Sequence, residues 1–348
     1  RSSSAASDVY KRQVEYGAVF DISNDSSTQK VVVNFVDEDN SIIGEEAFMN
    51  PANSEEFTIG YYLSKELGMF DFDFGFRLDQ IERSGSVSEE EHEDEHGDDH
   101  GDEHGDEHGE VDYYNIDDTT SSFAVTLGRS LSDNLDVSLG YASFERLPSS
   151  IELFMNGPHM ATGRFEVGDP NLNSETSNNF DVTFNFDNGD FYAFASFYIT
   201  DVDNYIALID EEEEDHMDED EHHEDEDEHH EDEDEHDDHG NLIHANYMQK
   251  DAEFDGYEIE FGRSFDLGSG ELALSFGRDV VNAEFADGHN VPRINPARNI
   301  YSLVYTQDDL LFKLMLKDVE KQNDFGEGET ATDSVSYTHL RAHETKRN

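Results

Sequence analysis

Apolar and polar residues alternate strictly along much of this chain. Over residues 70–79, Phe or Leu occupies every second position, and Asp, Gly or Arg occupies the positions between them. A period of two residues places these sets on opposite faces of a β-strand, whereas a helix requires a period of 3.6. The alternation recurs and predicts about twelve strands, most of about 8 to 14 residues. Their centres lie at 14–22, 31–35, 57–61, 70–78, 123–127, 137–141, 180–186, 190–201, 257–261, 272–276, 301–305 and 310–316.

The connections between these strands alternate between short and long. The short ones, most of them rich in Asp, Asn, Gly or Ser, are typical of hairpin turns and cover 23–28, 64–68, 131–134, 187–189, 266–269 and 307–309. The long ones cover 37–55, 83–112, 148–176, 203–246, 284–296 and 320–333. Short turns at one rim and long loops at the other are typical of outer-membrane β-barrels. A soluble sandwich or propeller has shorter strands and no reason for this alternation.

The sequence therefore predicts an all-β fold, a transmembrane antiparallel β-barrel with long loops rich in His, Asp and Glu. The Phe and Leu face is expected to meet lipid. The opposite face, which carries Asp71, Asp73 and Asp79, is expected to line the lumen.

The composition excludes several classes of function. The formal net charge of −64 makes duplex nucleic acid a poor partner, because phosphate binding needs a basic surface. The chain has no cysteine, which excludes disulfides and thiolate metal sites. No apolar run reaches the length of about 18 residues that a transmembrane helix needs, and no secretory signal is visible. Catalytic groupings such as Ser-His-Asp or a zinc-protease HExxH motif are also absent, so we do not predict an enzyme or a resident cofactor.

Both ends of the chain differ in pattern from the rest. Residues 1–13 and 334–348 resemble translated sequencing-adapter read-through and are interpreted as non-native flanks. The informative part is then 14–333, one partial barrel domain with low-complexity loops at 83–112 and 203–246. We expect it to be a piece of a longer protein.

Two runs of histidine and carboxylate interrupt the strand pattern. The upstream run, Ser88–Glu110, contains histidines about every fourth residue, at His92, His96, His100, His104 and His108. The downstream run, within 209–244, contains seven more, at His216, His222, His223, His229, His230, His236 and His239. Imidazole with carboxylate suits Zn²⁺, and imidazole alone suits Cu²⁺ or Ni²⁺, whereas Ca²⁺ and Mg²⁺ have no use for histidine.

These runs are predicted to capture cations as arrays of interchangeable weak sites. In the upstream run a glycine follows each histidine from His96 to His108, and each glycine costs a helix about 1 kcal/mol relative to alanine. One ordered cage is therefore not expected; tethering instead raises the effective ligand concentration. The alternative is that both runs are solvated anionic loops, but such loops need no periodic histidine. Among the histidines outside the two runs, His159 is the first candidate for an ordered ligand, followed by His244 and His289.

One loop and its flanking strands carry a more specific pattern. It reads E-R-L-P-S-S-I-E-L-F over 145–154, N-G-P-H-M-A-T over 156–162 and F-E-V-G-D over 165–169. This pattern resembles TonB-dependent receptors and is most similar to their zinc-uptake (ZnuD-like) branch. Further matches lie at 44–51, 254–258 and 291–298, so the resemblance covers most of 44–298.

The resemblance implies a receptor in the outer membrane of a Gram-negative bacterium, with a barrel of about 22 strands around an N-terminal plug. It implies the TonB energy-transducing complex, divalent metal ions and outer-membrane lipid as partners, and Zn²⁺, or else Cu²⁺ or Ni²⁺, as the transported ion. The chain shows no plug, TonB box or terminal aromatic strand, so it is expected to be truncated. Two other functions stay open: a receptor for an iron chelate or haem, and a barrel that buffers metal without transporting it.

Overall fold

The computed structural model describes residues 8–44, 47–88, 111–211 and 242–344. It contains one curved antiparallel sheet in which thirteen long strands follow one another in chain order. These are β1 (Asp8–Asp21), β2 (Thr28–Ile43), β3 (Ala52–Leu67), β4 (Phe70–Ser88), β5 (Val111–Ser132), β6 (Leu135–Arg146), β9 (Glu175–Asp187), β10 (Phe191–Asp210), β11 (Ile243–Asp266), β12 (Glu271–Phe285), β13 (Arg298–Gln307), β14 (Leu310–Val319) and β15 (Val335–Glu344). The helix α1 (Ser150–Phe154) and the short strands β7 (Asn156–His159) and β8 (Arg164–Val167) lie between β6 and β9.

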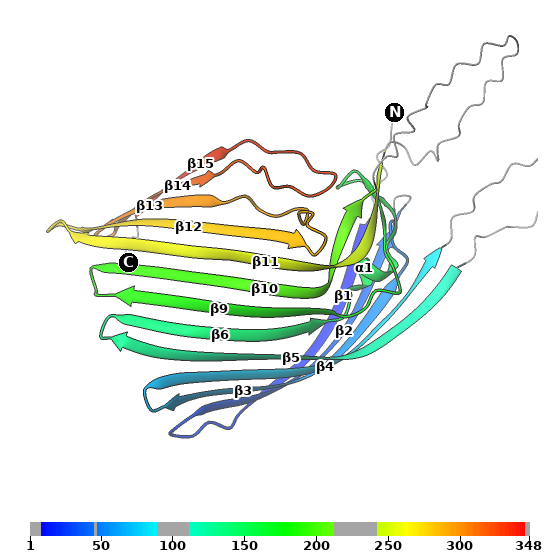
Figure 1. The fold of residues 1–348 in the computed structure, drawn as a ribbon, viewed down its shortest axis with the longest axis horizontal. Helices are drawn as coiled ribbons and strands as arrows, with labels where there is room; N and C mark the ends of the chain where they lie inside the picture. Colours follow the sequence, from blue (N-terminus) through cyan, green and yellow to red (C-terminus); the bar gives the residue numbers. More distant parts are fainter. Residues whose placement is uncertain (1–7, 45–46, 89–110, 212–241, 345–348) are drawn as a thin grey trace, which may run out of the picture.

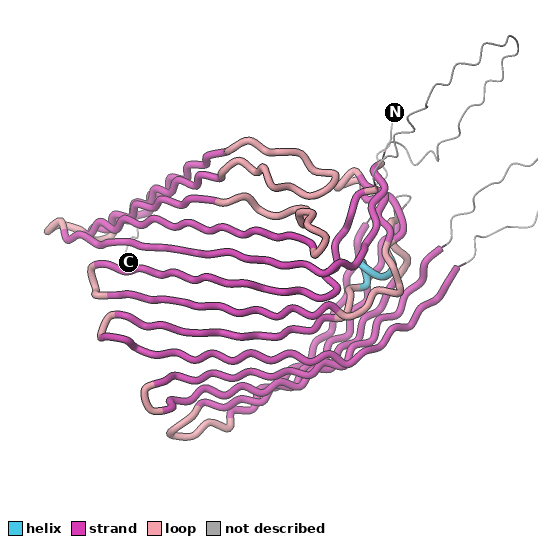
Figure 2. The backbone as a smooth tube through the Cα atoms, in the orientation of Figure 1, coloured by secondary structure: helices cyan, strands magenta, loops and turns pink. Residues whose placement is uncertain are grey.

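The prediction of an all-β antiparallel fold is confirmed. All six predicted hairpin turns lie at one edge of the sheet, and the long connections lie at the other, as Figures 1 and 2 show. The twelve predicted strands correspond to β1–β6 and β9–β14. Within the parts of the chain that the structure describes, no helix is long and apolar enough to cross a membrane.

Strand register aligns the apolar positions into one continuous belt. Phe76 lies opposite both Tyr61 and Phe123, and Phe276 lies opposite both Phe261 and Tyr301. The same alignment holds across β6, β9 and β10, where Tyr141, Phe180 and Ile199 stand in one row. Most of these large side chains are exposed, as expected for a surface that faces lipid rather than a protein core. We call this the outward face.

The other face of the sheet is polar. Asp79 lies between Thr58 on β3 and Thr120 on β5, and the Thr58 hydroxyl donates a hydrogen bond of 2.6 Å to its carboxylate. Asp71 and Asp73 share this face because they are separated from Asp79 by even numbers of residues along β4. The predicted lumen-lining positions therefore lie together on the inward face.

Most strands are longer than the alternation predicted, with lengths from 10 to 24 residues instead of about 8 to 14. Strand β10 continues to Asp210 and β11 begins at Ile243, well inside the predicted loop 203–246. The reason lies on the outward face, which changes from apolar to acidic after Ile199 on β10 and before Tyr257 on β11. Beyond the membrane the outward face no longer has to be apolar, and Val202, Ile206 and Ile209 are buried against neighbouring segments. The strand therefore loses the alternation while it keeps its hydrogen bonds.

The two ends of the chain also form strands in this structure. Asp8–Gln13 extends β1 along β2, and Val335–Glu344 pairs with β14 as a thirteenth long strand. The interpretation of residues 1–13 and 334–348 as non-native flanks concerns their origin, and it stays a prediction.

Candidate metal-capture rim

Both histidine-carboxylate runs leave the sheet at its long-connection edge. The upstream run joins the end of β4, at Ser88, to the start of β5, at Val111. The downstream run joins the end of β10 to the start of β11. The twelve histidines of these runs lie outside the described residues. The single candidate ligands within the described residues are His159, His244 and His289.

The segment between β6 and β9 folds back against the inward face. A capping box begins α1: the Ser149 N–H donates to Glu152 at 2.6 Å, and the Glu152 N–H donates to the Ser149 hydroxyl at 3.4 Å. Leu153 and Phe154 are fully buried. The Phe154 ring lies against Gly85 of β4, where a Cβ atom would stand 2.4 Å from ring carbon Cδ2. Glycine at position 85 is therefore what allows the helix to approach the sheet.

His159 lies at the end of β7, in a small sheet formed by β7, β8 and the start of β11. Its Nδ1 atom is 3.0 Å from Oε1 of Glu166, and the Thr162 hydroxyl is 2.7 Å from the same oxygen. Glu166 is almost fully buried, whereas the His159 side chain keeps 32% of its exposure and packs on the Phe48 ring at 4.8 Å. A carboxylate at Nδ1 fixes the orientation of the imidazole and directs Nε2 away from that carboxylate, as hydrogen-bonded carboxylates do for metal-binding histidines in general.

His244 is the second residue of strand β11 and lies directly opposite Phe165 of β8. Their rings are stacked at a centroid distance of 5.2 Å. Phe165 and Glu166 are consecutive, so their side chains point to opposite faces of the small sheet. The structure therefore places His159 and His244 on opposite faces of this sheet and does not bring them together.

The first carboxylate of the downstream run has a structural role. Asp210 is buried and receives two hydrogen bonds of 2.7 Å from Arg164, one on each oxygen. Arg293 lies 3.6 Å from Asp210 and donates a hydrogen bond of 2.7 Å to the carbonyl of Leu208. The two hydrogen bonds that Arg164 donates to Asp210 hold the pKa of its guanidinium above the ordinary value. Asp210 thus joins β8, β10 and the connection after β12 where the acidic run begins.

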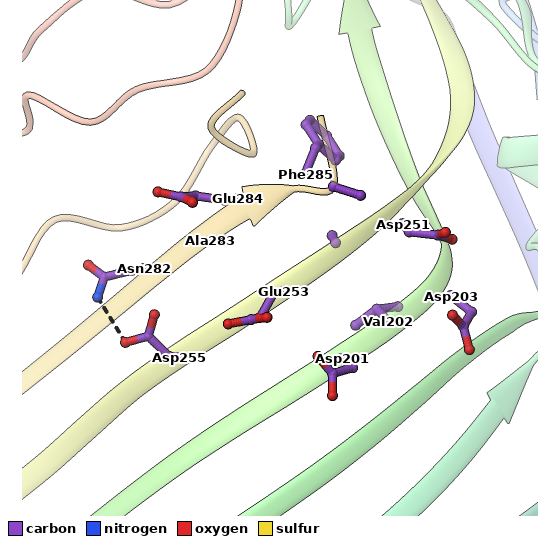
Figure 3. Close-up of a pocket in the computed structure, with 12 residues that line it drawn as sticks. Asp201, Val202, Asp203, Asp251, Glu253, Asp255, Asn282, Ala283, Glu284 and Phe285 are labelled. Atoms are coloured by element: carbon purple, nitrogen blue, oxygen red, sulfur yellow. Dashed lines mark hydrogen bonds between the residues drawn. The ribbon is translucent and has the colours of Figure 1, made fainter. Parts of the chain in front are cut away.

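A strongly acidic hollow of about 580 Å³ lies nearby on β10, β11 and β12 (Figure 3). Asp201 stands directly opposite Glu253, which in turn stands opposite Glu284, so three carboxylates form one row across three strands. The lining contains no basic side chain and six carboxylates, namely Asp201, Asp203, Asp251, Glu253, Asp255 and Glu284. Such a surface raises the local concentration of cations.

His289, the third single candidate, lies in the connection after β12. Its Nδ1 atom is 3.0 Å from Asp287, and Lys250 is 3.1 Å from the same carboxylate. The backbone N–H of His289 and the Lys250 ammonium lower the pKa of the Asp287 carboxyl to about 2. Asp287 therefore stays ionised at any physiological pH.

Across 8–44, 47–88, 111–211 and 242–344, no three His, Asp or Glu side chains are grouped so that they could hold a metal ion. The described part of the rim supplies an acidic surface and two histidines with a carboxylate at Nδ1, the half-buried His159 and the exposed His289. The sequence indicated His159 but gave no role to its partner Glu166, which could have been found only from the hairpin pairing of 156–159 with 164–167.

Comparison with known families decides what kind of barrel this is. The sequence matches the model of the family described as TonB dependent receptor-like, beta-barrel, over residues 4–342. The chain belongs to this family of TonB-dependent receptors. Members are outer-membrane proteins of Gram-negative bacteria, and they are transporters rather than enzymes, as the sequence predicted. The long-connection edge of the receptor is accordingly the extracellular rim, and the hairpin turns face the periplasm.

Solved structures share this fold. A protein described as copper transporter OprC superposes with a TM-score of 0.71 at 14% identity, covering 99% of this chain and 50% of its own. The ferric-catecholate import receptor Fiu from E. coli K12 gives a TM-score of 0.60 at 13% identity, with coverages of 99% and 49%. The ferric yersiniabactin uptake receptor FyuA from Yersinia pestis gives 0.59 at 12%, with coverages of 97% and 48%. The chain thus spans about half the length of these receptors.

Proposed function

We propose that this receptor, of the zinc-uptake (ZnuD-like) branch, imports zinc or a similar divalent ion such as Cu²⁺ or Ni²⁺, and that its two histidine-carboxylate runs capture the ion at the cell surface. The observation that carries this proposal is that both runs connect strands at the extracellular rim of a TonB-dependent receptor. The His159–Glu166 pair and the acidic hollow at the same rim support it. Energy would come from the TonB complex, through a plug domain in a complete barrel of about 22 strands.

The chemistry of the runs favours Zn²⁺, Cu²⁺ and Ni²⁺ over the hard cations Ca²⁺ and Mg²⁺. Imidazole nitrogen binds Zn²⁺, Cu²⁺ and Ni²⁺, whereas Ca²⁺ and Mg²⁺ prefer oxygen alone. Many weak sites on one tether keep an ion near the rim although each single site releases it quickly. After capture, His159 would be the first ordered ligand that an ion meets, and it would bind the ion through Nε2.

The capture step is expected to depend on pH. Imidazole binds metal only when neutral, and its unperturbed pKa is about 6.5. A peptide of residues 209–244 is therefore expected to bind Zn²⁺ at pH 7.4 and to release it near pH 5. Isothermal calorimetry measures this, with the same peptide carrying glutamine at each histidine as the control. Equal affinity for Zn²⁺ and Ca²⁺ would contradict capture by histidine.

The import step is tested in zinc-limited cells that produce the complete receptor. Changing the twelve histidines of both runs to glutamine keeps the carboxylates and is expected to lower ⁶⁵Zn²⁺ uptake by about tenfold at limiting zinc, because the gain from multivalent tethering is lost. Uptake at saturating zinc should change little. His159→Ala should reduce uptake at both concentrations, while His289→Gln should not. Uptake of a ferric chelate or haem, with no uptake of zinc, would instead favour the rival substrate.

A further inference from the structure

The outward face carries an unusual distribution of charge. In a chain with 85 acidic and 21 basic residues, acidic side chains are expected almost everywhere. On the extracellular side of the apolar belt acidic residues prevail at outward positions, with Asp37, Glu55, Glu82, Asp201 and Asp255, although Arg12 and Arg278 also lie there. On the periplasmic side, between the belt and the hairpin turns, the charged residues at outward positions of β1–β14 are Lys65, Arg129 and Arg263, all basic.

All three cations lie two or three residues before the end of their strands, next to the hairpin turns. Lys65 lies opposite Phe72, Arg129 lies opposite Val137, and Arg263 lies opposite both Phe191 and Leu274. Each partner belongs to the outward face, and each cation is exposed. They therefore occupy the periplasmic border of the apolar belt. A lipid-facing cation costs about 2–4 kcal/mol at the membrane midplane but only about 0–1 near an interface.

Aromatic rings hold two of these cations in place. The guanidinium of Arg129 lies over the Phe70 ring, 5.5 Å from its centroid, and that of Arg263 lies over the Phe265 ring at 5.1 Å. Both rings stand beside hairpin turns. An arginine fixed over a ring at this depth keeps its stem in the apolar layer and presents its N–H groups to the headgroup layer.

We infer that Lys65, Arg129 and Arg263 form a binding belt for the phosphate groups of anionic phospholipids in the periplasmic leaflet. The guanidinium is suited to phosphate, since it donates two parallel hydrogen bonds to neighbouring oxygens. Each cation close to an anionic membrane surface contributes about a fivefold preference for the charged lipid. The belt would fix the vertical position of the barrel, and it does not depend on which ion the receptor imports.

Native mass spectrometry of the complete receptor tests this inference. The receptor is released from detergent that contains either dioleoyl phosphatidylglycerol or zwitterionic dioleoyl phosphatidylcholine, and retained lipids are counted. We expect the wild type to retain the anionic lipid preferentially. The variant K65Q/R129Q/R263Q should lose this preference, and R129Q or R263Q alone should lower it by about fivefold.

The matched control removes the same charge from the inward face. Lys30, Lys313 and Lys317 lie at inward positions of β2 and β14, so K30Q/K313Q/K317Q should retain the preference. If the outward triple variant does not fold, R263Q and the wild type in 0.5 M NaCl give the same test, because salt screens an exposed phosphate contact. An unchanged preference in the outward variants, or an equal loss in the inward triple variant, would overturn the inference.

Discussion

Replacing Asp210 with alanine is expected to lower the free energy of unfolding of the rim by about 3–5 kcal/mol, the cost of removing one partner from a buried ion pair. Arg164 would keep its charge in a site where 19% of its side chain is exposed, without the carboxylate that accepts its two hydrogen bonds. The effect should be local, because Asp210 joins β8 to the end of β10 rather than holding the belt together. Hydrogen exchange of residues 156–167 should therefore accelerate while exchange in the apolar belt stays unchanged.

Two controls separate the buried pair from a general effect of charge. Asp201→Ala removes an exposed carboxylate from the same strand and should change stability by less than about 0.5 kcal/mol. In a double-mutant cycle, adding Arg164→Met to Asp210→Ala should recover part of the loss, because it removes the unpaired charge. Equal exchange rates in Asp210→Ala and Asp201→Ala would contradict the anchoring role of Asp210.

The second large effect is expected at Phe154. Its side chain is fully buried and packs against Gly85 and the Tyr114 ring, whose centroid is 6.3 Å away. Phe154→Ala should cost about 3–5 kcal/mol, through lost burial and the cavity left between α1 and β4. Protease resistance of the segment 147–174 measures the loss. Ile151→Ala, on the exposed side of the same helix, is the matched control and should have little effect.

Gly85 offers a sharper version of this test. In the wild type, Gly85→Ala would push a methyl group into the Phe154 ring, so it should weaken the docking of α1. In the Phe154→Ala background the same methyl group enters the cavity and should restore part of the stability. If Gly85→Ala were equally harmful in both backgrounds, the ring would not be what this glycine accommodates.

The alternation over 70–79 was sufficient to predict a strand, its lipid face and its lumen face. The reason is that a membrane strand sorts its side chains with a period of two, wherever its neighbours lie. Strand ends were predicted poorly. Beyond Leu78 and before Tyr257 the outward positions become polar, so the alternation of apolar and polar residues ends and these parts of the strands resemble loops in sequence.

The candidate rim, too, was predictable from the sequence only in part. Histidine spacing and the absence of cysteine predict the class of metal ligand from residue chemistry alone, and this stays a prediction. Asp210 belonged, by sequence, to a run of 22 carboxylates from Asp210 to Asp238 that look alike. Only the folded chain distinguishes it, because Arg164 and Arg293 reach it from connections 46 and 83 residues away.

The sequence by itself determined the strand class, the order of turns and loops, the lipid-facing side and the chemistry of the two runs. These properties follow from local period and composition, which every short segment carries with it. Tertiary structure decided that His159 is oriented by Glu166, that His244 lies on the opposite face of the small sheet, and that three scattered cations lie on the outward face beside the hairpin turns. Each of these depends on register between segments far apart in the chain, and a shift of one residue in any strand pairing would move the side chains to the opposite face.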